Sequence, residues 1–165
     1  MILATDVQYR DDGSAAVAGV LFGAWAAPMP ERVIRTVLTE VEPYVPGQFF
    51  RRELPCILHL LTLCPPVDTV IVDGYVDVLP DHPGLGRHLF DRLGGYTPVV
   101  GVAKTRYHGT HALPLCRGGS NNPLYITSAG MAPSVARDLV ESMSGDFRLP
   151  TLLKLADRVA RQEER

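Results

Sequence analysis

The 165-residue sequence predicts an α/β fold, a mixed β-sheet flanked by helices, formed as one domain over residues 1–165. The first support is a set of three apolar stretches near the start, at 2–9, 15–25 and 31–42. The second is an alternation of helical and strand patterns that begins near residue 54. The third is the composition, 46% hydrophobic and 21% charged, which is typical of a globular protein with a buried core.

The first three stretches are expected to pair as an antiparallel meander. Ile2–Tyr9 reads as a buried strand, and an Asp-Asp-Gly turn at 11–13 leads into the strand at 15–25. In 31–42 the valines recur on one face, which favours a third strand. The next segment, 43–47, reads Pro-Tyr-Val-Pro-Gly, and its two prolines exclude a helix or a central strand. It is therefore predicted to be a stiff loop that carries an aromatic residue.

The rest of the chain alternates between helical and apolar strand patterns. The fully apolar strand patterns are typical of strands in the middle of a sheet that is covered on both faces. The predicted elements are helices over 54–63, 84–93, 134–142 and 149–161, and strands over 69–72, 98–103 and 123–127.

Charge and cysteine usage narrow the class of protein. The net charge of −2 provides no general positive field, which argues against a pure nucleic-acid-binding module. Three cysteines without a Cys-x-x-Cys pair predict small buried thiols in a reducing compartment rather than zinc ligands or disulfides. No apolar stretch approaches the roughly 20 residues of a membrane span, and no signal peptide is recognised at the start. The expected location is the cytoplasm.

Three acidic residues carry the strongest functional signal. Asp6 and Asp73 follow short apolar strand patterns, and Glu53 precedes the first predicted helix, so all three are expected at or near element ends. Singly, each also fits a structural role as a turn residue or a helix-start residue. Together, carboxylates at strand ends suit a hard cation such as Mg²⁺ or Mn²⁺. Such a site can clamp a phosphodiester between metal ions, which predicts a metal-dependent nuclease.

Several sequence blocks resemble the endonuclease V family, repair nucleases that act at deaminated adenine (inosine) and share a ribonuclease-H-like fold. The blocks occur in the family's order and extend almost from end to end of the chain. They are Asp6-Val7-Gln8-Tyr9, Pro43-Tyr44-Val45-Pro46-Gly47 followed by Arg52-Glu53, Asp73-Gly74 with Gly84-Leu85 and His88-Leu89, Gly101-Val102-Ala103-Lys104, Ser128-Ala129-Gly130, and Leu149-Pro150 with Ala156-Asp157-Arg158 and Arg161.

The resemblance implies a catalytic centre and a substrate. Asp6, Glu53 and Asp73 would ligate Mg²⁺, for which Mn²⁺ can substitute. Lys104 would approach the scissile phosphate or its water as a point charge. The implied substrate is inosine-containing DNA or RNA, cut at a phosphodiester bond 3′ to the deaminated purine.

The resemblance also implies residues that contact the nucleic acid. Tyr44, on the loop with Pro46 and Gly47, would push into the duplex beside the lesion and offset part of the cost of extruding a base. Its structural alternative is a surface loop anchor. Gly74 and Gly130, together with Gly101, would let the backbone approach the extruded base closely.

The chain departs from the family pattern around this centre. Met131 stands where the family usually has a histidine, which is expected close to the metal site. Val76, Leu79 and Asp81 occupy the positions of a family glycine, histidine and arginine, and the segment 108–122 is shorter than the family's hairpin region.

Other polar side chains are candidates to replace the missing groups. The imidazole of His82, His108 or His111 could replace the lost histidine, although a loop histidine is usually just solvated. Asp77 or Asp81 could add a metal ligand or a hydrogen-bond acceptor.

Basic residues on the last predicted helix share one face. Lys154, Arg158 and Arg161 are spaced at i, i+4 and i+7, so they could lie along phosphates or form an ordinary solvated face. The function expected from the sequence is an endonuclease of the endonuclease V type. The alternative is a catalytically weakened protein that binds nucleic acid with damaged or modified bases, motivated by Met131 and Leu79.

Overall fold

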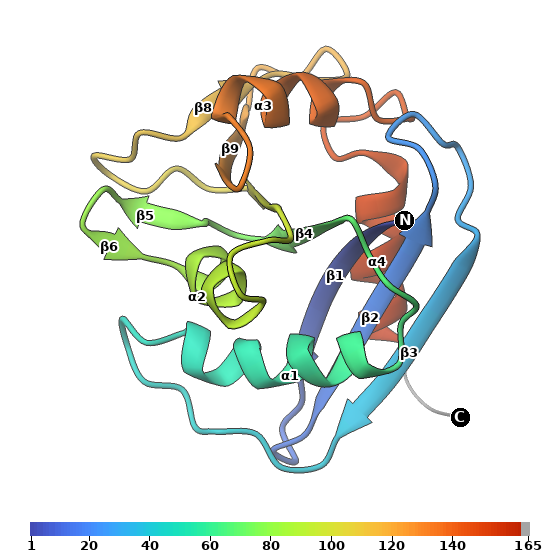
Figure 1. Ribbon diagram of the computed structural model, residues 1–165, viewed down its shortest axis with the longest axis vertical. Coiled ribbons are helices and arrows are strands. Elements are labelled where there is room, and N and C mark those ends of the chain that lie inside the picture. The colour runs from blue at the N-terminus through green and yellow to red at the C-terminus, as the bar shows by residue number, and fades with distance from the viewer. Residues whose placement is uncertain (163–165) are drawn as a thin grey trace.

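The structure, a computed structural model, describes residues 1–162. It contains a seven-stranded mixed sheet of order β3-β2-β1-β4-β7-β9-β8 and a small two-stranded ribbon, β5-β6 (Figure 1). The strands are β1 (Ile2–Tyr9), β2 (Ala15–Phe22), β3 (Arg32–Leu38), β4 (Thr69–Asp73), β5 (Asp77–Leu79), β6 (His82–Pro83), β7 (Val99–Ala103), β8 (Leu113–Leu115) and β9 (Leu124–Ala129). The helices are α1 (Phe50–Thr62), α2 (Leu85–Arg92), α3 (Pro133–Glu141) and α4 (Thr151–Arg161).

The sheet confirms the predicted α/β class. Strands β1, β2 and β3 form the antiparallel meander expected from the first three apolar stretches. Strands β1, β4 and β7 are parallel neighbours, whereas β9 is antiparallel to both β7 and β8. The directions of these strands decide which residues meet at each edge of the sheet.

Helices cover both faces of the sheet. On one face α1 and α2 pack on side chains such as Leu3, Val70 and Val72. On the other face α3 and α4 pack on side chains that include Ala4 and Ile71. Figure 1 shows α1 in front of the first strands and α4 behind them. Because side chains alternate along a strand, the central strands, such as β1, β4 and β7, contribute to both cores.

The observed elements differ from the predicted ones mainly in length. The second and third strands end at Phe22 and Leu38, earlier than the predicted limits of 25 and 42. Helix α1 begins at Phe50, four residues before the predicted start, and contains Pro55. Strands β5, β6 and β8 were not predicted, because each is two or three residues long and too short to show an alternating pattern.

The cysteines and helices bear on the predicted location. Cys56, Cys64 and Cys116 are all free, but only Cys56 is buried, so the prediction of buried thiols is wrong for Cys116, which is exposed. Within residues 1–162, no helix combines the length and the apolar character that crossing a membrane requires.

Gly101, in the middle of β7, packs against the protein itself rather than facing an open surface. A Cβ atom there would lie 2.5 Å from Thr127 Oγ1, 2.6 Å from the Gly74 carbonyl oxygen and 2.9 Å from the backbone nitrogen of residue 76. The expectation that Gly101 lets the backbone approach an extruded base is therefore wrong. Its lack of a side chain allows the turn after β4 to pack on β7.

We expect Gly101→Ala to lower the free energy of unfolding by about 1–3 kcal/mol, because the added methyl group meets backbone atoms that cannot move freely. Urea denaturation followed by circular dichroism measures this change. Gly23→Ala is the matched control, since its Cβ would meet only the flexible Glu31 carboxylate, at 2.7 Å. An equal loss in both variants would contradict the close-packing role of Gly101.

Candidate active site

The carboxyl ends of the parallel strands bring three polar side chains together. Asp73 is the last residue of β4, as predicted, and Lys104 directly follows β7. Asp6 lies inside β1, three residues before its end at Tyr9. The pairing of β1 with β4 stops at Ala4 and Ile71, and Asp6 lies just beyond this point. All three side chains point to the α4 face of the sheet, because they continue the alternation of the core residues before them.

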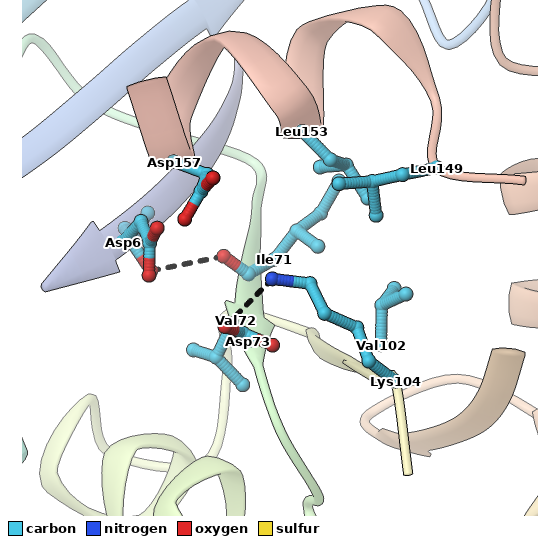
Figure 2. A pocket seen from close by; sticks show the side chains of 10 residues that line it. Asp6, Ile71, Val72, Asp73, Val102, Lys104, Leu149, Leu153 and Asp157 are labelled. Carbon is cyan, nitrogen blue, oxygen red and sulfur yellow. Dashed lines mark hydrogen bonds and ion pairs between the residues drawn. The ribbon is translucent and has the colours of Figure 1, made fainter. Parts of the chain in front are cut away.

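Helix α4 adds a fourth polar group from that face. In Figure 2 the carboxylate of Asp157 points down from α4 toward Asp6, and the Lys104 ammonium lies beside Asp73. Lys104 Nζ is 3.3 Å from Asp73 Oδ2. These four side chains line a small cavity of about 20 Å³, together with Leu149 and Leu153. A cavity of this size holds about one water molecule or ion.

Glu53 approaches the same strand ends from the opposite face of the sheet. It lies in the first turn of α1, is only 4% exposed and does not line the small cavity. Its Oε2 atom is buried and has no hydrogen-bond partner within residues 1–162. The preceding Arg52 places its guanidinium 3.6 Å from the centre of the Tyr9 ring, which attaches the start of α1 to β1. Buried carboxylates without partners are costly, so this position needs a functional explanation.

Burial and mutual repulsion shift the titration of these acids. Burial, the charge of Asp73 and a hydrogen bond with Asp157 raise the pKa of Asp6 to about 7. Burial and the charges of Asp73 and Asp6 raise the pKa of Glu53 well above its usual range. Burial opposes ionisation of Asp157, but hydrogen bonds with Arg161 and Asp6 outweigh it and lower the pKa of Asp157. Arg161 Nε is 2.9 Å from Asp157 Oδ1. The pair of Asp6 and Asp157 therefore shares a proton near neutral pH.

The donor groups are of the kind that binds a hard divalent cation, although the side chains are not positioned to coordinate one as they stand. Within residues 1–162, no three acidic, histidine or cysteine side chains are close enough to ligate one ion as they stand. The Asp73 oxygen is engaged by Lys104, and Glu53 lies on the other face. The chemistry still fits, because the groups are carboxylates, they repel one another, and Glu53 Oε2 is buried and unpartnered. Binding a cation would require side chains such as that of Asp73 to reorient.

These shifts predict that the metal-free protein loses stability as the pH rises. The folded-state pKa of Asp6 lies above its ordinary value of 3.8, so the stabilisation by its protonated form is complete below about pH 4. That stabilisation is lost as the pH rises through about 7, and three pKa units correspond to roughly 4 kcal/mol at most. In EDTA, the melting temperature should therefore fall between pH 5 and pH 8.

Differential scanning fluorimetry over this pH range measures the effect. Mn²⁺ or Mg²⁺ should raise the melting temperature more at pH 8 than at pH 5, because a cation replaces the proton. Asp6→Asn should flatten the pH dependence in EDTA, whereas Asp138→Asn, on the exposed surface of α3, should leave it unchanged. A melting temperature that rises from pH 5 to pH 8 in EDTA would contradict the raised pKa of Asp6.

A larger hollow of about 580 Å³ opens beside the carboxylates. Asp73 lines both this hollow and the small cavity, so the two spaces meet at this residue. The walls of the larger hollow are rich in aromatic and apolar side chains, including Phe49, Tyr75 and Tyr107. Phe50 and His88 form a stacked pair within the wall, with ring centroids 3.7 Å apart and planes inclined by 19°. A flat aromatic ligand fits such walls.

Some of the predicted nucleic-acid contacts adjoin this hollow. Gly47 and Gly74 line it, and both have positive φ angles, of 76° and 134°. Tyr44 and Pro46 lie on the same exposed loop as Gly47, and the Tyr44 side chain is 58% exposed. The loop therefore presents an aromatic ring to solvent beside the hollow.

Gly130 and Met131 lie elsewhere, which corrects two expectations. Strand β9 is antiparallel to β7, and Ala129 pairs with Val99 at the start of β7, whereas Asp73 pairs with Val102 near its end. Gly130 thus lies at the opposite end of the strands from Asp73. It packs near Phe90 and Pro98 and does not join the candidate site. Met131 packs against the hydrophobic core beside it. A methionine at this position therefore removes no group from the carboxylate centre.

The other candidate replacements are scattered. Asp81 and His82 line the large hollow, whereas His111 lines a separate cavity of about 170 Å³ beside Leu79. His108 is exposed on the loop after β7. Asp77 is held by Arg87, with Nη2 2.8 Å from Oδ2, so it is engaged in an ion pair on the ribbon.

Comparison with known proteins agrees with the resemblance. The family model described as Endonuclease V matches residues 1–135. Endonuclease V of Xanthomonas oryzae is 33% identical over 178 residues, which cover 94% of this chain and 74% of the relative. The chain belongs to the endonuclease V family. The crystal structure of endonuclease V from Streptomyces avermitilis superimposes with a TM-score of 0.77 at 27% identity, covering 97% of this chain and 79% of that one.

A further structural match confirms the ribonuclease-H-like fold of this endonuclease V family member. The Ciona intestinalis endonuclease V, in complex with a 24mer DNA containing an inosine followed by a ribo-adenosine, has a TM-score of 0.74. At 19% identity, and with coverage of 97% of this chain and 84% of that chain, it supports the fold alone.

The residue that sequence reasoning missed is Asp157. It lies within the Ala156-Asp157-Arg158 block that resembles the endonuclease V family, but the sequence analysis assigns it no role in the site. A signal was present in the sequence, because Asp157 follows the apolar Leu149 and Leu153 by eight and four residues and so shares their side of the predicted helix. The basic face is also weaker than predicted, since Arg161 pairs with Asp157 and Lys154 lies 5.2 Å from the centre of the Phe147 ring.

Proposed function

We propose that this protein is a Mg²⁺-dependent endonuclease that hydrolyses a phosphodiester bond 3′ to inosine in DNA or RNA, as a step in repair. Mn²⁺ is proposed to substitute for Mg²⁺. The family membership supports nuclease chemistry, and the donor set of Asp6, Glu53 and Asp73, extended by Asp157, supports a hard cation. We place the protein in the cytoplasm, where the exposed Cys116 thiol stays reduced.

The observation that carries this proposal is the position of Asp73 between two spaces of different chemistry. On one side lie acidic groups around a cavity of about 20 Å³, and on the other an aromatic hollow of about 580 Å³. A nucleic acid could therefore place a base in the hollow and a neighbouring phosphate at the carboxylates. This arrangement suits cleavage at a defined distance from a recognised base.

The protein's own residues would orient the substrate and stabilise charge. Asp6, Glu53, Asp73 and Asp157 would hold the divalent cations, which when bound would activate water and stabilise charge on the leaving oxygen. The Lys104 ammonium, already within 3.3 Å of Asp73, would offset charge that develops on the phosphate. Asp157 would position Asp6 through their hydrogen bond.

The aromatic hollow and the proline-rich loop would recognise the base. Tyr44, exposed between Pro43 and Pro46, is placed to fill the gap that an extruded base leaves in the stack. Gly47 and Gly74 would allow a base to approach the backbone closely, because neither has a side chain facing the hollow. The walls contributed by Phe49 and Tyr107 would stack on the base, as aromatic side chains do in other nucleic-acid sites.

The alternative function is binding of damaged nucleic acid without cleavage. It was based on Met131 and Leu79, and only Leu79 still supports it. Met131 lies at the end of the strands opposite to Asp73, so its presence does not weaken the carboxylate centre. Leu79 still replaces a polar group of the family pattern, beside the cavity of about 170 Å³. We therefore favour the nuclease and retain the binding protein as an outcome of the test.

Gel electrophoresis of matched DNA and RNA oligonucleotides, each with one inosine or none, tests the proposal. Each oligonucleotide would be tested in single- and double-stranded form, in reactions that contain Mg²⁺, Mn²⁺ or Ca²⁺. We expect a product cut one nucleotide beyond the inosine in Mg²⁺ or Mn²⁺, and none without a divalent cation. Binding without cleavage in any metal would favour the alternative, and equal cutting of strands that lack inosine would contradict the proposed specificity.

A further inference from the structure

We infer that Arg148 is a positioning residue of the active site, which sets the place of Lys104 relative to helix α4. This inference rests on the proposed function, in which Lys104 acts beside the scissile phosphate. Arg148 does not line the cavities at Asp73 and would not touch the substrate there. It would act through the backbone that carries Lys104.

The guanidinium of Arg148 holds three backbone carbonyl groups from two distant segments. Its Nη2 group donates to the carbonyl oxygens of Lys104 and, at 3.0 Å, of Pro123. Its Nε group donates to the Asn122 carbonyl oxygen at 2.8 Å. Arginine can serve several acceptors at once because its donors are arranged in a rigid, planar fork.

These contacts lie where the strand ladder can no longer hold Lys104. The pairing of β7 with β9 ends at Ala103 and Tyr125, one residue before Lys104. Arg148 thus holds the carbonyl group of the first residue beyond this pairing, whose side chain enters the site.

Arg148 also stands next to the segment that leads into α4. Leu149 lines the small cavity together with Lys104 and Asp157, and α4 begins at Thr151. One guanidinium therefore joins the end of β7, which carries Lys104, to the start of the helix that carries Asp157. Loss of this link should let Lys104 move relative to Asp73.

A second arginine, Arg117, stabilises the loop that carries Arg148. The fold of this loop can therefore be distinguished from the contact that Arg148 makes with Lys104. Arg117 is only 8% exposed, and it donates to the carbonyl oxygens of Met143, at 2.6 Å, and Phe147, at 2.8 Å. Burial lowers the pKa of Arg117. Arg117 holds the loop, whereas Arg148 extends from the loop to Lys104.

The sequence provides a direct readout, because Lys104 and Lys154 are the only lysines in the chain. In a Lys154→Arg background, lysine labelled with ¹³C at Cε gives one side-chain signal, that of Lys104. The Asp73→Asn variant in this background defines the chemical shift of Lys104 without its carboxylate partner. This measurement needs neither metal nor substrate, so it is independent of cleavage.

The test compares Arg148→Gln with the matched control Arg137→Gln. Arg137 also donates from Nε to one backbone carbonyl group, that of Pro114 at 3.0 Å, but away from the site. We expect Arg148→Gln to move the Lys104 signal at least halfway to its position in Asp73→Asn, and Arg137→Gln to leave it in place. On an inosine oligonucleotide, kcat should fall about 10- to 100-fold with KM changed less than about threefold, as expected for misplacement of a catalytic group.

The signal of Lys104 decides the inference. A movement of less than half the Asp73→Asn displacement in Arg148→Gln overturns it, whatever happens to cleavage. If the parent protein cleaves no inosine strand, the proposed function fails, while the signal still tests the positioning role. If circular dichroism shows that Arg148→Gln does not fold, Arg148→Lys replaces it, and its additional lysine signal is identified by difference from the parent.

Discussion

Asp73→Ala should lower the cleavage rate of an inosine oligonucleotide by about 10³-fold or more while leaving the fold intact. Asp73 ends β4, pairs with Lys104 and lines both the small cavity and the aromatic hollow. Among residues 1–162, no other residue lines both of these spaces. Its loss would remove one proposed ligand of the cation and the partner that holds Lys104.

Single-turnover kinetics with saturating Mn²⁺, together with circular dichroism and thermal melting, measure this effect. The control Asp138→Ala removes an exposed aspartate of α3, outside both cavities. Turnover by Asp73→Ala at a rate close to that of the parent would refute the assignment of the active site. A variant that no longer folds would be replaced by Asp73→Asn, which keeps the size of the side chain.

Asp157→Asn should lower the cleavage rate by about 10²-fold, a loss typical of removing one preorganised group from an active site. The substitution keeps the shape of the side chain but replaces the carboxylate that is hydrogen-bonded to Asp6 by a neutral amide. It also breaks the ion pair with Arg161, but this pair is partly exposed, so the melting temperature of the metal-free protein at pH 8 should fall only slightly. A large loss of activity with a small loss of stability would distinguish a functional carboxylate from a structural one.

Parallel measurements of cleavage and melting temperature test this combination. Asp138→Asn serves as the control, because it makes the same chemical change at an exposed site. A rate within twofold of the parent would exclude Asp157 from the centre. A large fall in melting temperature would instead assign it a structural role, through its ion pair with Arg161.

Asp73→Ala and Asp157→Asn each remove one carboxylate from the same acidic centre. The centre gathers acids of like charge in a partly buried space, and the raised pKa values of Asp6 and Glu53 express the cost of doing so. Lys104 offsets part of that cost from the β7 side, and Arg161 does so from α4. A protein would be expected to retain such an arrangement only if a cation or a substrate uses it.

The sequence by itself determined the fold class, the meander, the family and three of the residues that meet at the strand ends. Apolar alternation places strands regardless of distant contacts, and Asp73 was recognisable because a strand pattern ends at it. Lys104 was recognisable through the Gly-Val-Ala-Lys block. These signals are local, so they can be read directly from the order of the residues.

Only the tertiary structure decided which residues share the site with them. Met131 was expected near the centre and lies at the opposite end of the strands, because β9 is antiparallel to β7. Asp157 and Arg148 enter or support the centre from the end of the chain, because α4 packs on the same face of the sheet that carries Asp6. The direction of a strand and the face on which a helix packs depend on contacts between distant segments. No local pattern of residues specifies them.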